Sequence, residues 1–361
     1  MNGGRRAGGA GRVYAAATLS LAYLLVIHFS SGPPPSTRRE MAEASRLMER
    51  AVEAVGRCRE ARGIPIDAAA DPNRTGLIGL EASLITTSMG RLEAKRTSTN
   101  PEFAALLALL LRQAGVKKGQ AVAIGASSSF PAFIIASVAA SRAVGAEPLL
   151  IVSLGASEWG ANIPGFNWTD MEDCLRASGV LEAGPIALAL GGDEDAGLDM
   201  DPAGREFLVS LIGERGIPFI EGSGLEANVA VRLRLYEQSR GNRAIAAFIN
   251  IGGSWANMGT RAEVLKLRPG LARDVFVPPP AERGVLQAMA AREIPVVHLL
   301  NVKGLAERYG LPWDPRPLTS PGRGRISLAA AGRGAWDITL SAGFVLIAFF
   351  IVAFRVPGRL P

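Results

Sequence analysis

The feature that most constrains the fold is a regular alternation of short apolar runs with helical segments over residues 120–300. Each run is followed by a turn or loop rich in small and polar residues, as expected for a buried strand that leads towards a helix. The predicted strands are Ala121–Ile124, Pro148–Leu154, Pro185–Leu190, Ile217–Glu221, Ala244–Ile251 and Ile294–Leu300. This alternation predicts an α/β fold with an open, mostly parallel, Rossmann-like sheet flanked by helices.

The predicted helices follow from apolar residues spaced three and four apart. They are Arg38–Arg62, Phe103–Gln113, Phe130–Val144, Asp170–Ala177, Pro202–Arg215, Leu225–Arg240 and Ala281–Arg292. Together with the strands they define one domain over residues 36–311. The next stretch, Pro312–Arg325, is rich in Pro, Gly and Arg, so residues 312–335 are expected to form a linker.

Both ends of the chain carry long apolar segments. Val13–Phe29 is uncharged and measures about 25 Å as a helix, and the prolines after it disfavour signal cleavage, so residues 13–31 are expected to form an uncleaved anchor. Residues 336–354 are expected to form a second transmembrane helix. The tails, residues 1–12 and 355–361, carry arginines without acids. We therefore expect a two-pass protein of the inner membrane with cytoplasmic tails and an extracytoplasmic domain.

Charge and composition exclude several classes of function. Five of the six net positive charges come from Arg5, Arg6, Arg12, Arg355 and Arg359, so the domain itself is nearly balanced and no nucleic-acid partner is expected. Two Cys and two His without metal-ligand spacing predict no metal site. Cys58 and Cys174 are expected to be unlinked, partly buried thiols, with a disulfide as the alternative if the domain lies in an oxidising compartment.

Ligands of a parallel sheet bind at the carboxyl ends of its strands. Four loops leave predicted strands there: Gly125–Ser129, Ser153–Asn162, Gly191–Asp195 and Gly252–Thr260. The candidate ligand-binding residues are Gly125, Ser127, Ser128, Ser129, Ser157, Trp159, Asn162, Gly252, Gly253 and Ser254. The first loop opens a helix, whose free N–H groups and serine hydroxyls suit an anion, although the serines could merely cap that helix. Neither a dinucleotide fingerprint nor a phosphate loop is present, so no cofactor is expected.

A serine hydrolase is the alternative prediction. Ser127 lies in the sequence GASSS, which departs from the G-x-S-x-G nucleophile elbow at its last position. Asp193 or Asp195, and then His298, follow in the chain order Ser, Asp, His. His298 is the one histidine outside the first apolar segment, and the hydrolase hypothesis makes it the catalytic base. The competing interpretation is a hydrogen-bonded histidine in the core.

Several short motifs together resemble one protein family. They are GIPID (63–67), TGLIG (75–79), TSTNPEFAA (97–105), GASSSFPA (125–132), SLGASEWGAN (153–162), INIGGS (249–254) and RYGLP (308–312). The set is similar to the poly-gamma-glutamate system protein, a bacterial membrane protein associated with poly-γ-glutamate synthase and export components. The similarity covers roughly residues 40–315 and the two flanking apolar segments.

The resemblance implies an accessory role in capsule or envelope polymer synthesis or export. The expected partners are the synthase and export membrane subunits, the membrane and the anionic polymer itself. The family supplies no catalytic residues to transfer to this chain. A hydrolase or transferase acting on γ-glutamyl chains stays the alternative function.

Overall fold

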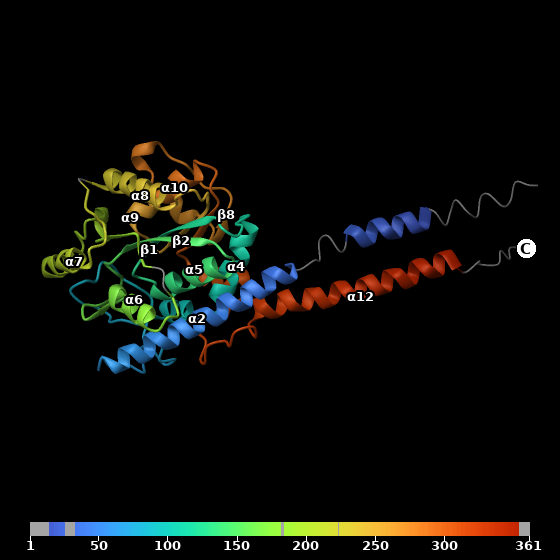
Figure 1. The fold of residues 1–361 in the computed structure, drawn as a ribbon, viewed down its shortest axis with the longest axis horizontal. Coiled ribbons are helices and arrows are strands. Elements are labelled where there is room, and N and C mark those ends of the chain that lie inside the picture. Colours follow the sequence, from blue (N-terminus) through green and yellow to red (C-terminus); the bar gives the residue numbers. More distant parts are fainter. Residues whose placement is uncertain (1–13, 26–32, 182–183, 223, 354–361) are drawn as a thin grey trace, which may run out of the picture. The chain divides into compact units, whose positions relative to one another are not determined.

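The computed structural model describes residues 14–25, 33–181, 184–222 and 224–353 (Figure 1). The chain divides into two compact units. The larger is Arg39–Ser327, and the smaller combines Met1–Arg38 with Leu328–Pro361. The large unit contains the sheet and the candidate site. The small unit contains a helix over residues 14–25 and most of helix α12 (Arg325–Ala353).

The large unit is built on a seven-stranded sheet in the order β6-β5-β2-β1-β7-β9-β8. The strands are β1 Ala121–Ser127, β2 Glu147–Ser153, β5 Ala187–Ala189, β6 Phe219–Ile220, β7 Ile245–Ile251, β8 Gly270–Ala272 and β9 Val296–Leu299. Neighbouring strands are parallel except β8, which runs antiparallel to β9. The predicted mostly parallel α/β sheet is confirmed, and all six predicted strands belong to it.

The strands that were not predicted are very short. Strand β8 spans three residues, and the hairpin of β3 (Asn162–Ile163) and β4 (Phe166–Asn167) has two residues in each strand. A period of two residues cannot be recognised in runs of this length. The hairpin lies between the predicted strand Pro148–Leu154 and the predicted helix Asp170–Ala177.

The strand order reverses beside β1. The chain leaves β1 for β2, β5 and β6 on one side, and then returns to place β7 on the other side of β1. Such a reversal separates the loops that follow the two central strands and leaves a crevice between them. The loops after β1 and β7 therefore flank the natural ligand position of this fold.

Helices cover both faces of the sheet (Figure 1). Their bounds are α2 Pro35–Ala61, α3 Leu92–Ser98, α4 Glu102–Gln113, α5 Pro131–Ala143, α6 Trp168–Ala177, α7 Pro202–Arg215, α8 Leu225–Ser239, α9 Trp255–Met258, α10 Val285–Ala290 and α11 Val302–Tyr309. Helices α4 and α5 pack together, with α5 against β1 and β2, whereas α8 and α10 pack against the sheet within a separate apolar cluster. The sheet is thus buried on both faces, which explains why its strands read as continuous apolar runs.

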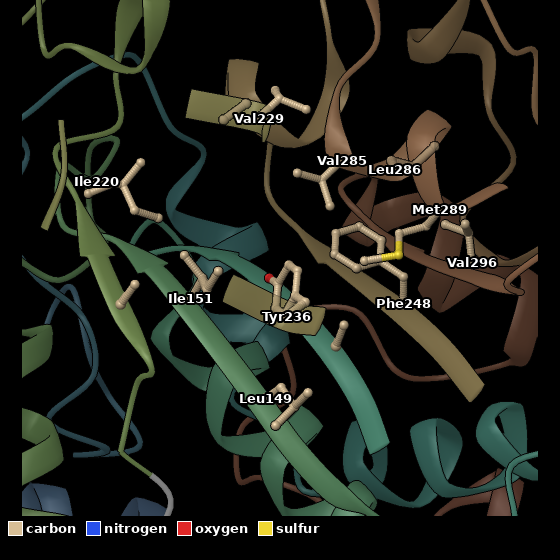
Figure 2. Close-up of a cluster of buried hydrophobic side chains, with 14 of the residues drawn as sticks. Leu149, Ile151, Ile220, Val229, Tyr236, Phe248, Val285, Leu286, Met289 and Val296 are labelled. Carbon is tan, nitrogen blue, oxygen red and sulfur yellow. The ribbon is translucent and has the colours of Figure 1, made fainter. Parts of the chain in front are cut away.

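Alternate residues of the central strands point to the face covered by α8 and α10 (Figure 2). Leu149 and Ile151 of β2 and Phe248 of β7 lie in this cluster. Tyr236 of α8 is fully buried among them, and its hydroxyl donates a 2.8 Å hydrogen bond to the carbonyl oxygen of Ile124. That bond satisfies the one polar atom of the ring and ties α8 to β1.

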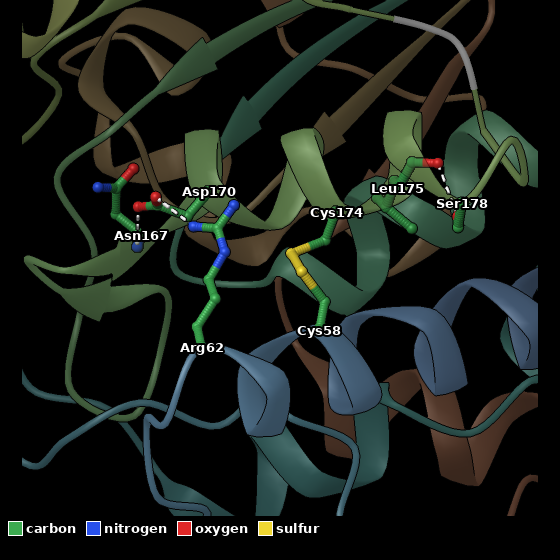
Figure 3. Close-up of a disulfide and its surroundings, with 7 residues drawn as sticks. All are labelled: Cys58, Arg62, Asn167, Asp170, Cys174, Leu175 and Ser178. Atoms are coloured by element: carbon green, nitrogen blue, oxygen red, sulfur yellow. Dashed lines mark hydrogen bonds and ion pairs between the residues drawn. A yellow bond between two sulfur atoms is a disulfide. The ribbon is translucent and has the colours of Figure 1, made fainter.

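Cys58 of α2 and Cys174 of α6 form a disulfide, with Cα atoms 5.9 Å apart (Figure 3). The expectation of two unlinked thiols is therefore corrected. An ion pair between Arg62 and Asp170, at 2.8 Å, lies beside the disulfide. Sequence could not pair the two cysteines, because the 116 residues between them say nothing about how α2 packs on α6.

Part of the segment that was expected to be a linker, residues 312–335, packs on the large unit. Asp314 accepts two 2.7 Å hydrogen bonds from the guanidinium of Arg96, and this pairing lowers the pKa of the Asp314 carboxyl. Ser327 donates to the carboxylate of Glu102 at 2.9 Å, and α12 already begins at Arg325. Proline and glycine predict an irregular backbone, but an irregular segment can still pack on its domain.

In the part of the chain that the structure describes, no helix has both the length and the apolar character needed to cross a bilayer. The expected spans over residues 13–31 and 336–354 thus gain no support from these helices. Residues 13, 26–31 and 354 of the two segments, and the tails over residues 1–12 and 355–361, lie outside the described residues.

Candidate functional site

A cavity of about 470 Å³ opens at the carboxyl ends of the central strands. It is lined by residues that follow β1, β2, β5 and β7, and by the segments that precede α3 and begin α11. We refer to it as the cleft. Its position matches the predicted crevice, because parallel strands bring their following loops to one edge of the sheet.

Three serines form a connected group on the cleft wall. The Oγ of Ser127 donates to the Oγ of Ser129 at 2.8 Å, and the backbone N–H of Ser157 donates to the same Ser129 Oγ at 2.9 Å. All three residues line the cleft. Strand β1 continues to Ser127, further than predicted, so that the loop after β1 meets the loop after β2 through these contacts.

Lys95 of α3 reaches this group from a helix that sequence analysis did not identify. Its Nζ donates to the carbonyl oxygen of Ser129 at 2.6 Å and to the Oγ of Ser157 at 2.7 Å. It also lies 4.0 Å from the centroid of the Phe130 ring. The side chain is buried, and this burial lowers the pKa of Lys95 to about 7, with the charge of Glu158 opposing the shift.

Further charged groups surround the cleft. Arg91 and Lys303 line it and are exposed, and Lys303 pairs with Glu307 at 4.0 Å. Asp193 and Asp199 line another part of the wall, where the N–H of Asp193 donates to Asp199 Oδ1 at 2.9 Å. Burial raises the pKa of the Asp199 carboxyl. With three basic and two acidic residues, the lining has an excess of basic groups.

Large apolar side chains are exposed at the same cleft. Met89, Trp255 and Trp313 all line it, with exposed fractions of 88%, 41% and 39%. They come from the segment before α3, from the start of α9 and from the segment after α11. A cleft that exposes thioether and indole surface beside cations suits a ligand with both apolar stretches and negative charge.

A buried ion pair holds the end of β2 at the cleft. The guanidinium of Arg232 in α8 bonds both carboxylate oxygens of Asp195, at 2.6 and 2.9 Å, and donates to the Oγ of Ser153 at 3.4 Å. Asn228 donates to the same carboxylate at 3.0 Å. Asp195 thus has a structural partner, and Ser153, which lines the cleft, is held at the end of β2.

The proposed triad of Ser127, Asp193 and His298 is not assembled. His298 lies on β9, and strand β7 separates it from β1. Its Nδ1 is 2.9 Å from the Nδ2 of Asn250, and the ring is 2% exposed. Burial lowers the pKa of His298 to about 4. His298 is therefore a hydrogen-bonded histidine in the core. Ser127 and Asp193, the other two members of the proposed triad, both line the cleft.

The predicted ligand-binding residues separate into two groups. Ser127, Ser129, Ser157, Gly253 and Ser254 line the cleft. The others pack behind it. Gly125 lies within β1 against the side chain of Asn257, Gly252 lies against Ser127, and Ser128 is fully buried.

Trp159 and Asn162 belong to the second group as well. The N–H of Trp159 donates to the carbonyl oxygen of Leu80 at 2.7 Å. The side-chain amide of Asn162 accepts from the N–H of Leu80 and donates to its carbonyl, both at 2.8 Å. These two residues anchor the segment around Leu80 on the loop after β2 and do not reach the cleft.

Sequence reasoning missed Lys95, Arg91, Lys303 and Trp313, and it placed Trp255 in the candidate loop Gly252–Thr260 but not among the ligand-binding residues. One signal for Lys95 was available, because the chain uses arginine for nearly all its basic positions and has only five lysines. Lysine titrates far more readily than arginine when it is buried, so a rare lysine beside an apolar helix was a candidate.

Among the described residues, no group of His, Cys, Asp and Glu is arranged to hold a metal ion. The sequence matches no family model, and comparison of the chain with curated proteins and with solved structures gives no match.

Proposed function

We propose that the large unit binds a carboxylate-bearing polymer of the poly-γ-glutamate kind in the cleft, as an accessory component of polymer synthesis or export at the cell envelope. The observation that carries the proposal is the combination at one cleft of exposed cations, Arg91 and Lys303, with exposed apolar side chains, Trp255 and Trp313.

The chemistry of the polymer fits this combination. Each γ-linked glutamate contributes an α-carboxylate and two backbone methylene groups. Carboxylates pair with guanidinium and ammonium groups, and methylenes cover indole rings. A repeating ligand that engages several weak sites at once gains affinity through effective concentration.

The resemblance supports the same site. Three of the motifs behind it contribute to the cleft: GASSSFPA through Ser127 and Ser129, SLGASEWGAN through Ser153 and Ser157, and INIGGS through Ser254. These motifs are far apart in the sequence. Their convergence is what a shared binding function requires.

Binding of fluorescent γ-linked glutamate oligomers to the full-length protein tests the proposal. We expect affinity to rise with oligomer length and to fall with salt, because exposed charges are screened. The double variant Arg91→Glu/Lys303→Glu should weaken binding roughly tenfold, about 1.4 kcal/mol. Lys117→Glu, which reverses an exposed charge outside the cleft lining, is the matched control. Equal binding by the double variant and the control would remove the basis for this function.

We also propose that the terminal segments anchor the domain on the outer side of the inner membrane, beside the synthase and export subunits. Within the small unit, the ring of Tyr23 stacks on Phe344 with centroids 4.2 Å apart, and its hydroxyl is 2.6 Å from the Oγ of Ser341. A disulfide in the large unit is also typical of an oxidising compartment.

Reporter fusions test this topology. A fusion after Pro35 is expected to report the outer compartment, and a fusion at Pro361 the cytoplasm. Both reporters in one compartment would exclude a two-pass arrangement with an external domain.

A further inference from the structure

The contact between Lys95 and Ser157 has the geometry of a nucleophile and its base. The Nζ and Oγ atoms are 2.7 Å apart, within the range that proton transfer requires. Both side chains line the cleft. Ser127, by contrast, donates its hydroxyl to Ser129, and among the described residues no basic side chain forms a hydrogen bond with it.

Lys95 is held in one place by its other contacts. Its Nζ donates to the carbonyl oxygen of Ser129 at 2.6 Å and lies over the Phe130 ring. Ser157 is fixed in turn, because its N–H donates to the Oγ of Ser129. Two rigid residues in contact need little reorganisation before a reaction.

The environment of Lys95 favours the neutral amine. Burial lowers the pKa of Lys95 to about 7, so a large fraction of the side chain has a free lone pair at neutral pH. In that form the hydroxyl of Ser157 can donate to Nζ. The charge that acts on Lys95 is that of Glu158, whose carboxylate accepts from the N–H of Gly90 at 2.8 Å. The other charged residues that line the cleft are Arg91, Lys303, Asp193 and Asp199.

We propose that Ser157 is a nucleophile and Lys95 its general base, and that the pair cleaves the amide C–N bonds of acyl substrates in the cleft. The γ-glutamyl substrate class rests on the proposed function. The Oγ of Ser157 attacks the carbonyl carbon while its proton passes to Lys95 Nζ. The C–N bond then breaks as Nζ returns that proton to the leaving amine. This leaves an acyl ester on Ser157.

Water completes the reaction. It attacks the ester carbonyl and gives a proton to Lys95 Nζ, which passes it to the departing Ser157 Oγ. The products are an amine and a carboxylic acid, and both catalytic residues return to their starting state. The Ser–Lys pair needs no histidine, which agrees with the burial of His298 in the core.

The test uses the full-length protein and γ-glutamyl p-nitrophenyl ester. We expect a burst of p-nitrophenol together with a one-acyl mass increase that maps to Ser157. Ser157→Ala and Lys95→Met should each reduce the burst rate at least 100-fold. Ser210→Ala and Lys117→Met alter exposed residues outside the cleft lining and should behave as wild type. In wild type the acylation rate should rise with pH and level off above about 7.

Two results would overturn the proposal: no adduct on Ser157, or an undiminished burst in a folded Lys95→Met protein. Ser157→Cys guards against a folding artefact, because it is close to isosteric and should still form a one-acyl adduct at that position. Oligomer binding by wild type separates this proposal from the previous one. If wild type binds oligomers but forms no adduct, the catalytic pair alone is overturned. If wild type forms the adduct but binds no oligomers, the pair stands and the proposed polymer-binding function is removed.

Discussion

At the scale of single residues, burial decides what each titratable group can do. Lys95 and His298 are both basic side chains with pKa values lowered by burial, to about 7 and about 4. Lys95 faces the cleft and contacts a serine hydroxyl, whereas His298 faces Asn250 inside the sheet. Burial therefore gives Lys95, at the cavity, a pKa close to neutral pH. The same effect keeps His298, in the core, uncharged at neutral pH.

The buried lysine predicts a specific pH dependence of stability. Between about pH 7 and 10 the unfolded chain keeps a proton that native Lys95 has lost, so the free energy of unfolding rises with pH. Replacing Lys95 by methionine removes this pH-dependent contribution to the free energy of unfolding. Lys95→Met should therefore be more stable than wild type at about pH 6, and this advantage should shrink towards pH 10 by on the order of 4 kcal/mol.

Urea unfolding of the full-length protein at several pH values measures the difference. Lys117→Met serves as the control, because that lysine is exposed. A difference between Lys95→Met and wild type that does not change with pH would mean that Lys95 keeps its ordinary pKa.

At the scale of elements, backbone packing shapes the cleft wall. Helix α7 packs closely against the backbone of Leu84 at Gly204, where a Cβ atom would overlap the carbonyl oxygen of Leu84. The segment from Leu84 continues to Thr87, whose N–H donates to the carbonyl oxygen of Ala156 at 3.0 Å. Thr87 and the residues after it line the cleft. The contact at Gly204 thus sets the position of one wall.

Two glycines of α7 give a matched pair of variants. Gly204→Ala should lower the free energy of unfolding by about 1–3 kcal/mol, because the Leu84 backbone must shift. Gly213→Ala should raise it by about 0.5–1 kcal/mol, because a Cβ there meets no atom and alanine favours a helix. Thermal and urea unfolding check both values. Similar changes in the free energy of unfolding for the two variants would show that helix propensity, and not the contact with Leu84, determines the effect of alanine in α7.

At the scale of the whole molecule, the disulfide closes a large loop. It joins α2 to α6 across a sequence separation of 116 residues, and closing a loop of that size restricts the unfolded chain. Reduction should therefore lower the free energy of unfolding by about 2–5 kcal/mol.

Melting temperatures with and without dithiothreitol measure this effect. The chain has no other cysteines, so the double variant Cys58→Ala/Cys174→Ala should be insensitive to the reductant. An unchanged melting temperature of wild type on reduction would contradict a stabilising cross-link.

The sequence by itself determined the sheet type and the longer elements. Apolar runs such as Ala121–Ile124 and helices such as Pro202–Arg215 are local patterns, because side-chain periodicity within a few turns or strand residues sets them. Their alternation implied parallel strands, and parallel strands bring the following loops to one edge. This is why Ser127, Ser129, Ser157 and Ser254, which come from loops after different strands, line one cleft.

Only the tertiary structure decided which side chains meet. Lys95 precedes the first strand and Trp313 follows the last, yet both line the cleft, whereas His298 sits at the end of a predicted strand and is excluded because β7 lies between it and β1. The Cys58–Cys174 pairing was undetermined for the same reason. These contacts depend on strand order and on how distant helices dock, and a short-range periodic pattern carries no information about either.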